Sequence, residues 1–121
     1  MKRILLVGLL IALAAIGISA QNLPSITIVN NTGYDIYHIE ISPSTDDEWS
    51  DEDLLEEETL KNGASKTFRL NYPLNSVYVY DIRLIDENVI WYIKWEVAIT
   101  NNARIVFTED DYWDENTYNP H

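Results

Sequence analysis

The most conspicuous chemistry in this 121-residue sequence is a run of carboxylates that we call the acidic loop, residues 46–58. Crowded carboxylates repel one another, so solvent, salt, a hard cation or a basic partner must offset the repulsion. Calcium takes about six to eight oxygen ligands, which makes it the obvious metal for such a loop. The acidic side chains, with no basic residue among them, are Asp46, Asp47, Glu48, Asp51, Glu52, Asp53, Glu56, Glu57 and Glu58. The predicted calcium ligands are Asp46, Asp47, Asp51, Asp53 and Glu57.

The spacing within the acidic loop fits the EF-hand calcium loop poorly. A loop that begins at Asp46 places Asp51 at the sixth position, where that turn requires glycine. Three interpretations therefore stay open. The segment is a solvated loop with Leu54 and Leu55 turned inward, a divalent cation site, or a docking surface for a basic protein.

Trp49 lies inside the acidic loop and suggests how a protein partner would bind. An exposed tryptophan on a charged loop is a typical contact anchor. The alternative is that Trp49 folds back over the edge of a sheet and stays buried. If the loop is a docking surface, we predict Trp49, Glu48 and Glu52 as its partner-binding residues.

The sequence offers little that indicates catalysis. Cysteine is absent, which excludes a disulfide scaffold, a thiolate metal site and a cysteine nucleophile. His38 is the only internal histidine, and Ser42 and Ser44 flank Pro43 in a turn rather than in a nucleophile motif. We therefore predict that the protein is not an enzyme; the alternative is a small hydrolase whose paired carboxylates the spacing does not reveal. The excess of 20 acidic over 8 basic residues argues against binding to nucleic acid.

Strands must position these side chains, because no segment after residue 20 has convincing helical periodicity. Turn residues separate six short segments of strand character at 25–30, 34–41, 65–70, 77–86, 89–100 and 103–108. In the second segment the apolar parity changes after Ile36, which predicts a β-bulge near Tyr37 and His38. The pattern predicts one all-β domain over residues 21–108, a small antiparallel β-sandwich of about six or seven strands, followed by an acidic polar tail at 109–121.

The segment 89–100 has the clearest pattern in the chain. Trp91, Ile93 and Trp95 share odd positions with Val97 and Ile99, a period of two that is typical of a half-buried antiparallel strand. This parity predicts that Trp91 and Trp95 lie in the core. They are not expected to form an exposed platform for carbohydrate.

Residues 1–20 have the three-part plan of a secretory signal peptide. Lys2 and Arg3 precede an apolar run, and Ala20 is a small residue at the predicted cleavage site. The apolar run is shorter than the roughly 20 residues that span a membrane, so we expect no membrane span after cleavage. Loss of Lys2 and Arg3 takes the formal net charge from −12 to −14. We expect an exported monomer, periplasmic or secreted.

Several short motifs follow one another in a specific order. They are VNNTGY at 29–34, ISPS at 41–44, Trp49, DLL at 53–55 and YDIRLID at 80–86. In this pattern the chain resembles an uncharacterised family of small exported bacterial β-rich proteins, over residues 26–107. The resemblance implies a compact exported β-rich domain, and it implies no activity and no site residues. The sequence departs from the pattern at Glu87-Asn88-Val89, which replaces the usual acidic-glycine turn, and at Glu56–Glu58, where a glycine is common.

Together these features predict an exported, non-catalytic binding module that uses the acidic loop. Its ligand would be a divalent cation or a basic protein. One specific version, based on analogy with other small acidic exported sandwiches, is an inhibitor of a basic cell-wall enzyme such as lysozyme. The negative charge would steer a cationic partner toward the protein, and salt would weaken that attraction.

Overall fold

Seven strands and one turn of 3₁₀-helix make up the computed structural model, which describes residues 23–50, 52–71 and 79–114. Strands form where β-branched and aromatic residues alternate between two faces. The six predicted strands correspond to the first six observed ones. The elements are β1 (Ser25–Asn31), β2 (Ile36–Pro43), β3 (Ser65–Arg69), β4 (Val79–Asp86), β5 (Trp91–Ala98), β6 (Ala103–Thr108), η1 (Glu109–Asp111) and β7 (Tyr112–Trp113).

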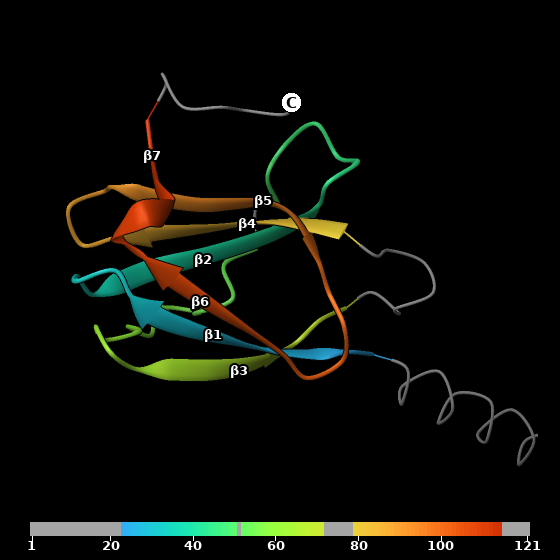
Figure 1. Cartoon of the computed structure of the whole chain (residues 1–121), viewed down its shortest axis with the longest axis horizontal. Coiled ribbons are helices and arrows are strands. Elements are labelled where there is room, and N and C mark those ends of the chain that lie inside the picture. Colours follow the sequence, from blue (N-terminus) through green and yellow to red (C-terminus); the bar gives the residue numbers. More distant parts are fainter. Residues whose placement is uncertain (1–22, 51, 72–78, 115–121) are drawn as a thin grey trace, which may run out of the picture.

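The strands form two sheets that lie against each other as the layers of a β-sandwich (Figure 1). One sheet has the order β3-β1-β6, and the other has the order β2-β4-β5-β7. This arrangement confirms the predicted small β-sandwich. Its neighbouring strands are antiparallel except for β1 and β6, which run parallel. Alternation of apolar and polar residues indicates which face of a strand is buried but not the direction of its neighbour, so the parallel pair was not foreseen.

The core between the sheets is almost entirely aliphatic and aromatic. The register of β2 against β4 shifts between Ile36 and His38, which confirms the predicted bulge. Because of this bulge, Ile36 and Ile39 both reach the core although their parity differs. The apolar side chains that are less than 2% exposed are Pro24, Ile26, Ile28, Ile36, Ile39, Leu55, Tyr80, Ile82, Leu84 and Phe107.

The acidic loop turns after β2 and then runs back along the edge of that strand. The N–H of Leu54 donates to the carbonyl of Ile39 at 2.8 Å, and Leu60 exchanges two hydrogen bonds of 2.9 Å with Ile36. Leu55 and Leu60 are buried in the core, as the inward-facing alternative predicted for Leu55. The segment thereby covers a sheet edge whose backbone groups would otherwise be unpaired.

The predicted core positions of Trp91 and Trp95 are wrong, because β5 contains a β-bulge. Glu96 adopts a φ of 52°, and the register of β4 against β5 shifts beside it. Before the bulge Tyr92 faces the core, and both tryptophans lie on the opposite face; after it Ile99 faces the core. The extra residue at the bulge changes which residues face the core beyond it. The sequence analysis assumed one unbroken alternation along the strand, and it therefore placed the first half of the strand on the wrong face.

The chain beyond β6 continues on the sandwich, where the sequence predicted a polar tail from residue 109. The hydroxyl of Thr108 accepts a hydrogen bond from the N–H of Asp110 at 3.2 Å, and the Asp111 carboxylate accepts one from the N–H of Thr108 at 2.9 Å. This capping box closes η1 and directs β7 onto β5, where Trp113 pairs with Trp91. Because this segment is polar, the sequence analysis assigned it to a tail and did not predict the turn that returns the chain to the sheet.

Two places where the sequence departs from the pattern of motifs have left-handed backbone. Glu56 and Glu57 have φ angles of 48° and 74°, and Val89 has a φ of 63°. Glycine adopts this conformation without the steric penalty of a β-carbon. The structure therefore gives a backbone reason why glycine would be common at these positions.

Some predictions fall on residues that the structure does not describe. The predicted signal peptide lies within residues 1–22, and Asp51 and the far part of the predicted tail also lie outside the described ranges. Across residues 23–50, 52–71 and 79–114, no helix has the length and apolar character needed to cross a membrane.

Candidate functional site

The polar residues of the VNNTGY motif are bonded into the fold. The amide of Asn30, which is completely buried, donates to the carbonyl oxygens of Tyr34 at 2.8 Å and Leu60 at 2.9 Å. Its Oδ1 accepts from the hydroxyl of Thr32 at 2.7 Å and from the N–H of the same residue at 3.1 Å. One side chain thus joins the β1–β2 turn to the segment that follows the acidic loop. A buried amide satisfied in this way stabilises the fold.

The ISPS and YDIRLID motifs meet where the acidic loop begins. Oδ1 of Asp81 accepts hydrogen bonds from the hydroxyl of Ser44 at 2.8 Å and from the N–H of Glu96 at 2.9 Å. The hydroxyl of Ser42 accepts one from the N–H of Ser50 at 2.6 Å. These contacts attach the loop to β2, β4 and the bulge of β5. The side chains of the motif residues therefore hold the start of the loop in place.

Asp53, a predicted calcium ligand, is also bonded within the fold. Its Oδ1 accepts from the N–H groups of Ile39 and Leu55, both at 3.0 Å, and its Oδ2 lies 2.7 Å from Nδ1 of His38. Partial burial raises the pKa of Asp53. The hydrogen bonds from His38 and the two amides outweigh that effect, and they leave the pKa below its ordinary value of 3.8. Ionised Asp53 therefore ties the acidic loop to β2 at neutral pH.

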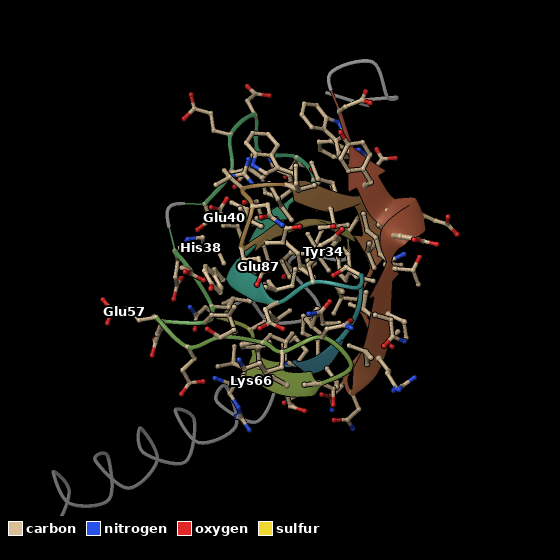
Figure 2. The ribbon with its side chains drawn as sticks, turned by 90° about the vertical axis from the view of Figure 1, so that its left-hand side faces the viewer. Tyr34, His38, Glu40, Glu57, Lys66 and Glu87 are labelled. Atoms are coloured by element: carbon tan, nitrogen blue, oxygen red, sulfur yellow. The ribbon has the colours of Figure 1, made fainter. Side chains whose placement is uncertain are left out.

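The structure does not gather the four described residues of the predicted calcium set, Asp46, Asp47, Asp53 and Glu57, into one cluster. Asp46 and Asp47 lie in the turn after β2, whereas Glu57 lies further along the loop and points away from the body at the left-hand edge of Figure 2. Asp53 is turned toward His38. Among the described residues, no group of three histidine, cysteine or acidic side chains is arranged to hold a metal ion. The calcium prediction thus has no assembled ligand set in that part of the chain.

The outer face of the four-stranded sheet, the face turned away from β1, β3 and β6, carries a cluster that the sequence analysis missed. Arg83 on β4 forms an ion pair with Glu40 on β2, and their side chains are only 12% and 18% exposed. The guanidinium of Arg83 lies between two indoles. Its Cζ is 4.6 Å from the ring centre of Trp49 and 4.4 Å from that of Trp91. Both distances are typical of a cation–π contact.

Two more indoles extend this stack on either side. Trp95 packs on Trp49 with ring centres 5.7 Å apart and a tilt of 41°, and Trp113 stacks on Trp91 at 5.2 Å and 22°. We call the series Trp95–Trp49–Arg83–Trp91–Trp113 the tryptophan–arginine ladder. It contains all four tryptophans of the chain, and it connects the acidic loop to β4, β5 and β7.

Trp49 thus adopts the folded-back arrangement that the sequence analysis left open. It is half-buried, and Arg83 and Trp95 hold it from two sides. Glu48 and Glu52, the other predicted partner-binding residues, are exposed on either side of it along the chain. Trp49 therefore fixes the loop on the outer face while the neighbouring carboxylates stay in solvent.

Two hollows border the acidic loop. The larger, of about 360 Å³, lies between the loop and the end of β3. Four apolar side chains line it together with six polar or charged ones, among them Glu52, Glu56 and Arg69. The smaller, of about 80 Å³, lies at the Trp95 end of the ladder. Its lining combines two indoles with carboxylates: Ser42, Asp46, Asp47, Glu48, Trp49, Asp81 and Trp95.

Comparisons with known proteins support the fold. No protein family model and no curated protein matches the chain. Among solved structures, the chain is similar to an NMR structure of a protein from Eubacterium rectale, with a TM-score of 0.53 and 16% sequence identity over 72% of this chain and 78% of that one. At this identity the similarity concerns the fold alone. It supports a small β-sandwich and assigns no role to any residue.

Proposed function

We propose that the protein is an exported, non-catalytic binding module that docks a basic protein on its acidic loop. The observation that supports this proposal is the separation of charge. Four of the six basic residues in the described part of the chain form ion pairs with acids of the same chain: Lys61 with Asp35, Lys66 with Glu58, Arg83 with Glu40 and Lys94 with Asp111. Seven described carboxylates of the acidic loop are exposed, and one of them, Glu58, belongs to these ion pairs; the other six are Asp46, Asp47, Glu48, Glu52, Glu56 and Glu57.

A basic partner would meet a loop whose backbone is already held in place. Leu55 anchors it in the core, Asp53 ties it to β2, and Trp49 fixes it on the outer face. Ordering a flexible loop on association costs free energy, and a preorganised loop avoids much of that cost. Figure 2 shows Glu57 pointing outward, while His38 and Glu40 lie closer to the sheet.

The partner that fits this surface is a protein with clustered lysine and arginine side chains. The first candidate is a basic cell-wall enzyme such as lysozyme, because export would bring the two proteins into one compartment. Long-range attraction would raise the association rate, and salt would reduce it. Export and membership of the resembling family belong to this proposal. The divalent-cation alternative has less support, because the predicted ligands are dispersed.

Surface plasmon resonance with lysozyme as the basic probe tests the proposal. We expect binding at low ionic strength that weakens steeply as salt is added. In the triple variant Asp46→Asn, Asp47→Asn, Glu48→Gln, we expect the association rate to fall about tenfold or more. A parallel assay of cell-wall lysis measures whether the bound enzyme is inhibited.

A control variant with the same change in net charge separates the loop from the overall charge. Glu87→Gln, Glu109→Gln, Asp110→Asn removes three exposed carboxylates elsewhere. The β4–β5 turn that carries Glu87 lies at the opposite end of the sheet from the turn after β2 (Figure 1). Docking on the acidic loop predicts a much smaller effect in this control. Equal losses in both triple variants, or no binding of lysozyme at low salt, would contradict the proposal.

A further inference from the structure

We infer that a hollow at the Trp113 end of the tryptophan–arginine ladder binds the apolar face of a sugar ring. The hollow measures about 220 Å³ and lies between the β4–β5 turn and β7, which are side by side at one end of the sandwich (Figure 1). This is the opposite end of the sheet from the turn after β2, where the acidic loop begins. The inference therefore does not depend on the proposed docking of a basic protein. The lining residues are Val89, Ile90, Trp91, Tyr112 and Trp113.

Apolar side chains gather around this hollow. Tyr112 is 48% exposed and Val89 is 73% exposed, and both are among the five large apolar side chains that the described part of the chain leaves exposed. Ile90, Trp91 and Trp113 are partly exposed beside them. None of the described side chains that line the hollow is charged. Single exposed apolar residues are common, but several that surround one hollow mark a binding site.

Val89 has a backbone conformation that a β-branched residue rarely adopts. Its φ of 63° lies in the left-handed region that favours glycine. Hydrogen bonds hold the turn in this shape, because the Asp86 carboxylate accepts from the N–H groups of Asn88 at 2.8 Å and Ile90 at 3.0 Å. The valine side chain gains little from burial in return, since it is largely exposed. It forms one wall of the hollow, so contact with a bound ligand accounts for a side chain at this strained position.

Trp113 supplies a second, independent indication of a ligand. Among the described residues its indole stacks only on Trp91, at 5.2 Å and 22°, whereas Trp91 also contacts Arg83. The indole nitrogen of Trp113 is buried and has no hydrogen-bond acceptor in the described part of the chain. A buried indole N–H normally has a partner, so the protein leaves this donor unsatisfied. Because no hydrogen bond fixes the indole, a small rotation would bring its N–H to an oxygen of a ligand in the hollow.

These features select a ligand with a flat apolar face and oxygen atoms at its edge. A β-linked pyranose presents ring C–H groups to an aromatic face, whose negative charge attracts their hydrogens. Its hydroxyl oxygens can accept hydrogen bonds from the indole N–H and from the Tyr112 hydroxyl. An aliphatic side chain of a partner protein would leave the indole N–H without an acceptor, and a cation would find no carboxylate among the lining side chains. Pockets for drug-sized ligands measure roughly 300–1,000 Å³, so this smaller hollow fits a single ring.

An NMR titration with tri-N-acetylglucosamine and with cellotriose, both β-linked oligosaccharides, tests the site. We expect at least one of them to shift the indole N–H resonances of Trp91 and Trp113, with a dissociation constant on the order of millimolar, and to leave those of Trp49 and Trp95 in place. Sorbitol carries hydroxyl groups without a ring and should cause no shift. Unshifted Trp91 and Trp113 with both oligosaccharides, or equal shifts with sorbitol, would overturn the proposal. Tighter binding of N-acetyl-leucine amide would also overturn it, in favour of a docking surface for protein.

A matched pair of tyrosine variants tests whether the hollow itself is responsible. Tyr112→Ala removes a lining side chain, and Tyr37→Ala removes a side chain of similar exposure, 45%, outside the hollow. We expect the first variant to weaken binding of the oligosaccharide by about 3- to 10-fold and the second by less than about twofold. Equal weakening in both would overturn the site.

Val89→Gly separates binding from stability. Glycine relieves the left-handed strain, so the melting temperature should stay the same or rise, while loss of one wall of the hollow should weaken binding by about threefold. A lower melting temperature with unchanged binding would show a purely structural role for Val89 and would overturn its part in the site. Because a sugar is neutral, its binding should not weaken with salt, in contrast to the binding of lysozyme. Failure of the sugar site and failure of the proposed docking are therefore distinguishable.

Discussion

The inner face of the four-stranded sheet is covered by a second sheet, whereas the outer face is covered by long side chains of the same layer and of the acidic loop. On the inner face Ile39, Ile82 and Leu84 are completely buried among apolar neighbours. On the outer face Glu40 and Arg83 are more than four-fifths buried, although both are charged. Indoles and a paired guanidinium can thus cover a sheet face that no second layer protects.

The two coverings have different consequences for the molecule. Aliphatic packing on the inner face contributes most of the stability, because it removes a large apolar area from water. The outer face buries less, but its contacts are directional and join segments that are distant in sequence. Through Trp49 they determine where the acidic loop lies relative to β4 and β5. The comparison separates residues that stabilise the fold from residues that position the loop.

The largest effect is expected on the inner face. Ile82→Ala should lower the free energy of unfolding by about 3 kcal/mol, because it removes buried methylene groups and leaves a cavity. Ile85→Ala, on the same strand but half-buried on the outer side, should lower it by about 1 kcal/mol. Urea unfolding followed by circular dichroism measures both. Equal losses would mean that the two faces do not differ as described.

A smaller loss of unfolding free energy is expected when Arg83, the central residue of the tryptophan–arginine ladder, is truncated. Arg83→Ala should lower the free energy of unfolding by about 2 kcal/mol, because two cation–π contacts disappear and the largely buried Glu40 loses its partner. Tryptophan emission should shift to longer wavelength as Trp49 becomes hydrated. Arg104→Ala, at an exposed position on β6, should stay within about 0.5 kcal/mol of the wild type. A loss as small as that of the control would show that the ladder does not stabilise the protein.

The smallest effect on stability is expected at the contact between the Asp53 carboxylate and β2, and it depends on pH. The pKa of Asp53 is lower in the folded protein than its ordinary value of 3.8, so the ionised form stabilises the fold above about pH 4. That stabilisation disappears as the pH falls through the folded pKa. Asp53→Asn should therefore be about 1 kcal/mol less stable than the wild type at pH 7, and this difference should shrink as the pH falls through the folded pKa of Asp53.

Urea unfolding at a series of pH values from 7 down into the acid range measures this difference. Asp47→Asn serves as the control, because the Asp47 carboxylate is exposed and its removal should produce no comparable change with pH. A gap between wild type and Asp53→Asn that stays constant over this range would contradict the assignment of the tie to the ionised carboxylate.

The strands and much of the core could be predicted from the sequence, because alternation and turn residues are local signals. They indicated the sandwich, the bulge after Ile36 and the inward position of Leu55. The bulge in β5 could not be predicted in the same way. At this bulge the N–H of Glu96 donates a hydrogen bond to Asp81 on the neighbouring strand, a contact that alternation along one strand does not reveal. Since one inserted residue reverses the parity, Trp91 and Trp95 were assigned to the wrong face.

The candidate site was less accessible to sequence reasoning. The acidic loop was evident from composition, but the direction of each carboxylate was not, and Asp53 is turned to His38 rather than toward a shared metal. Glu40 and Arg83 are 43 residues apart, and only the register of β2 against β4 brings them together. The one available signal was the outward parity of Arg83 on a strand that forms a hairpin with a tryptophan-rich segment.

The position of β1 has a consequence for how the chain acquires its structure. β1 lies between β3 and β6, so neither of its sheet neighbours follows it directly in the sequence. Its parallel partner, residues 103–108, is synthesised long after β1 has left the ribosome. Topologies dominated by such distant pairings fold slowly, in roughly milliseconds to seconds. The three-stranded sheet therefore stays incomplete until β6 has been synthesised, and the chain remains without this sheet for longer than a protein whose strands pair with their neighbours in sequence.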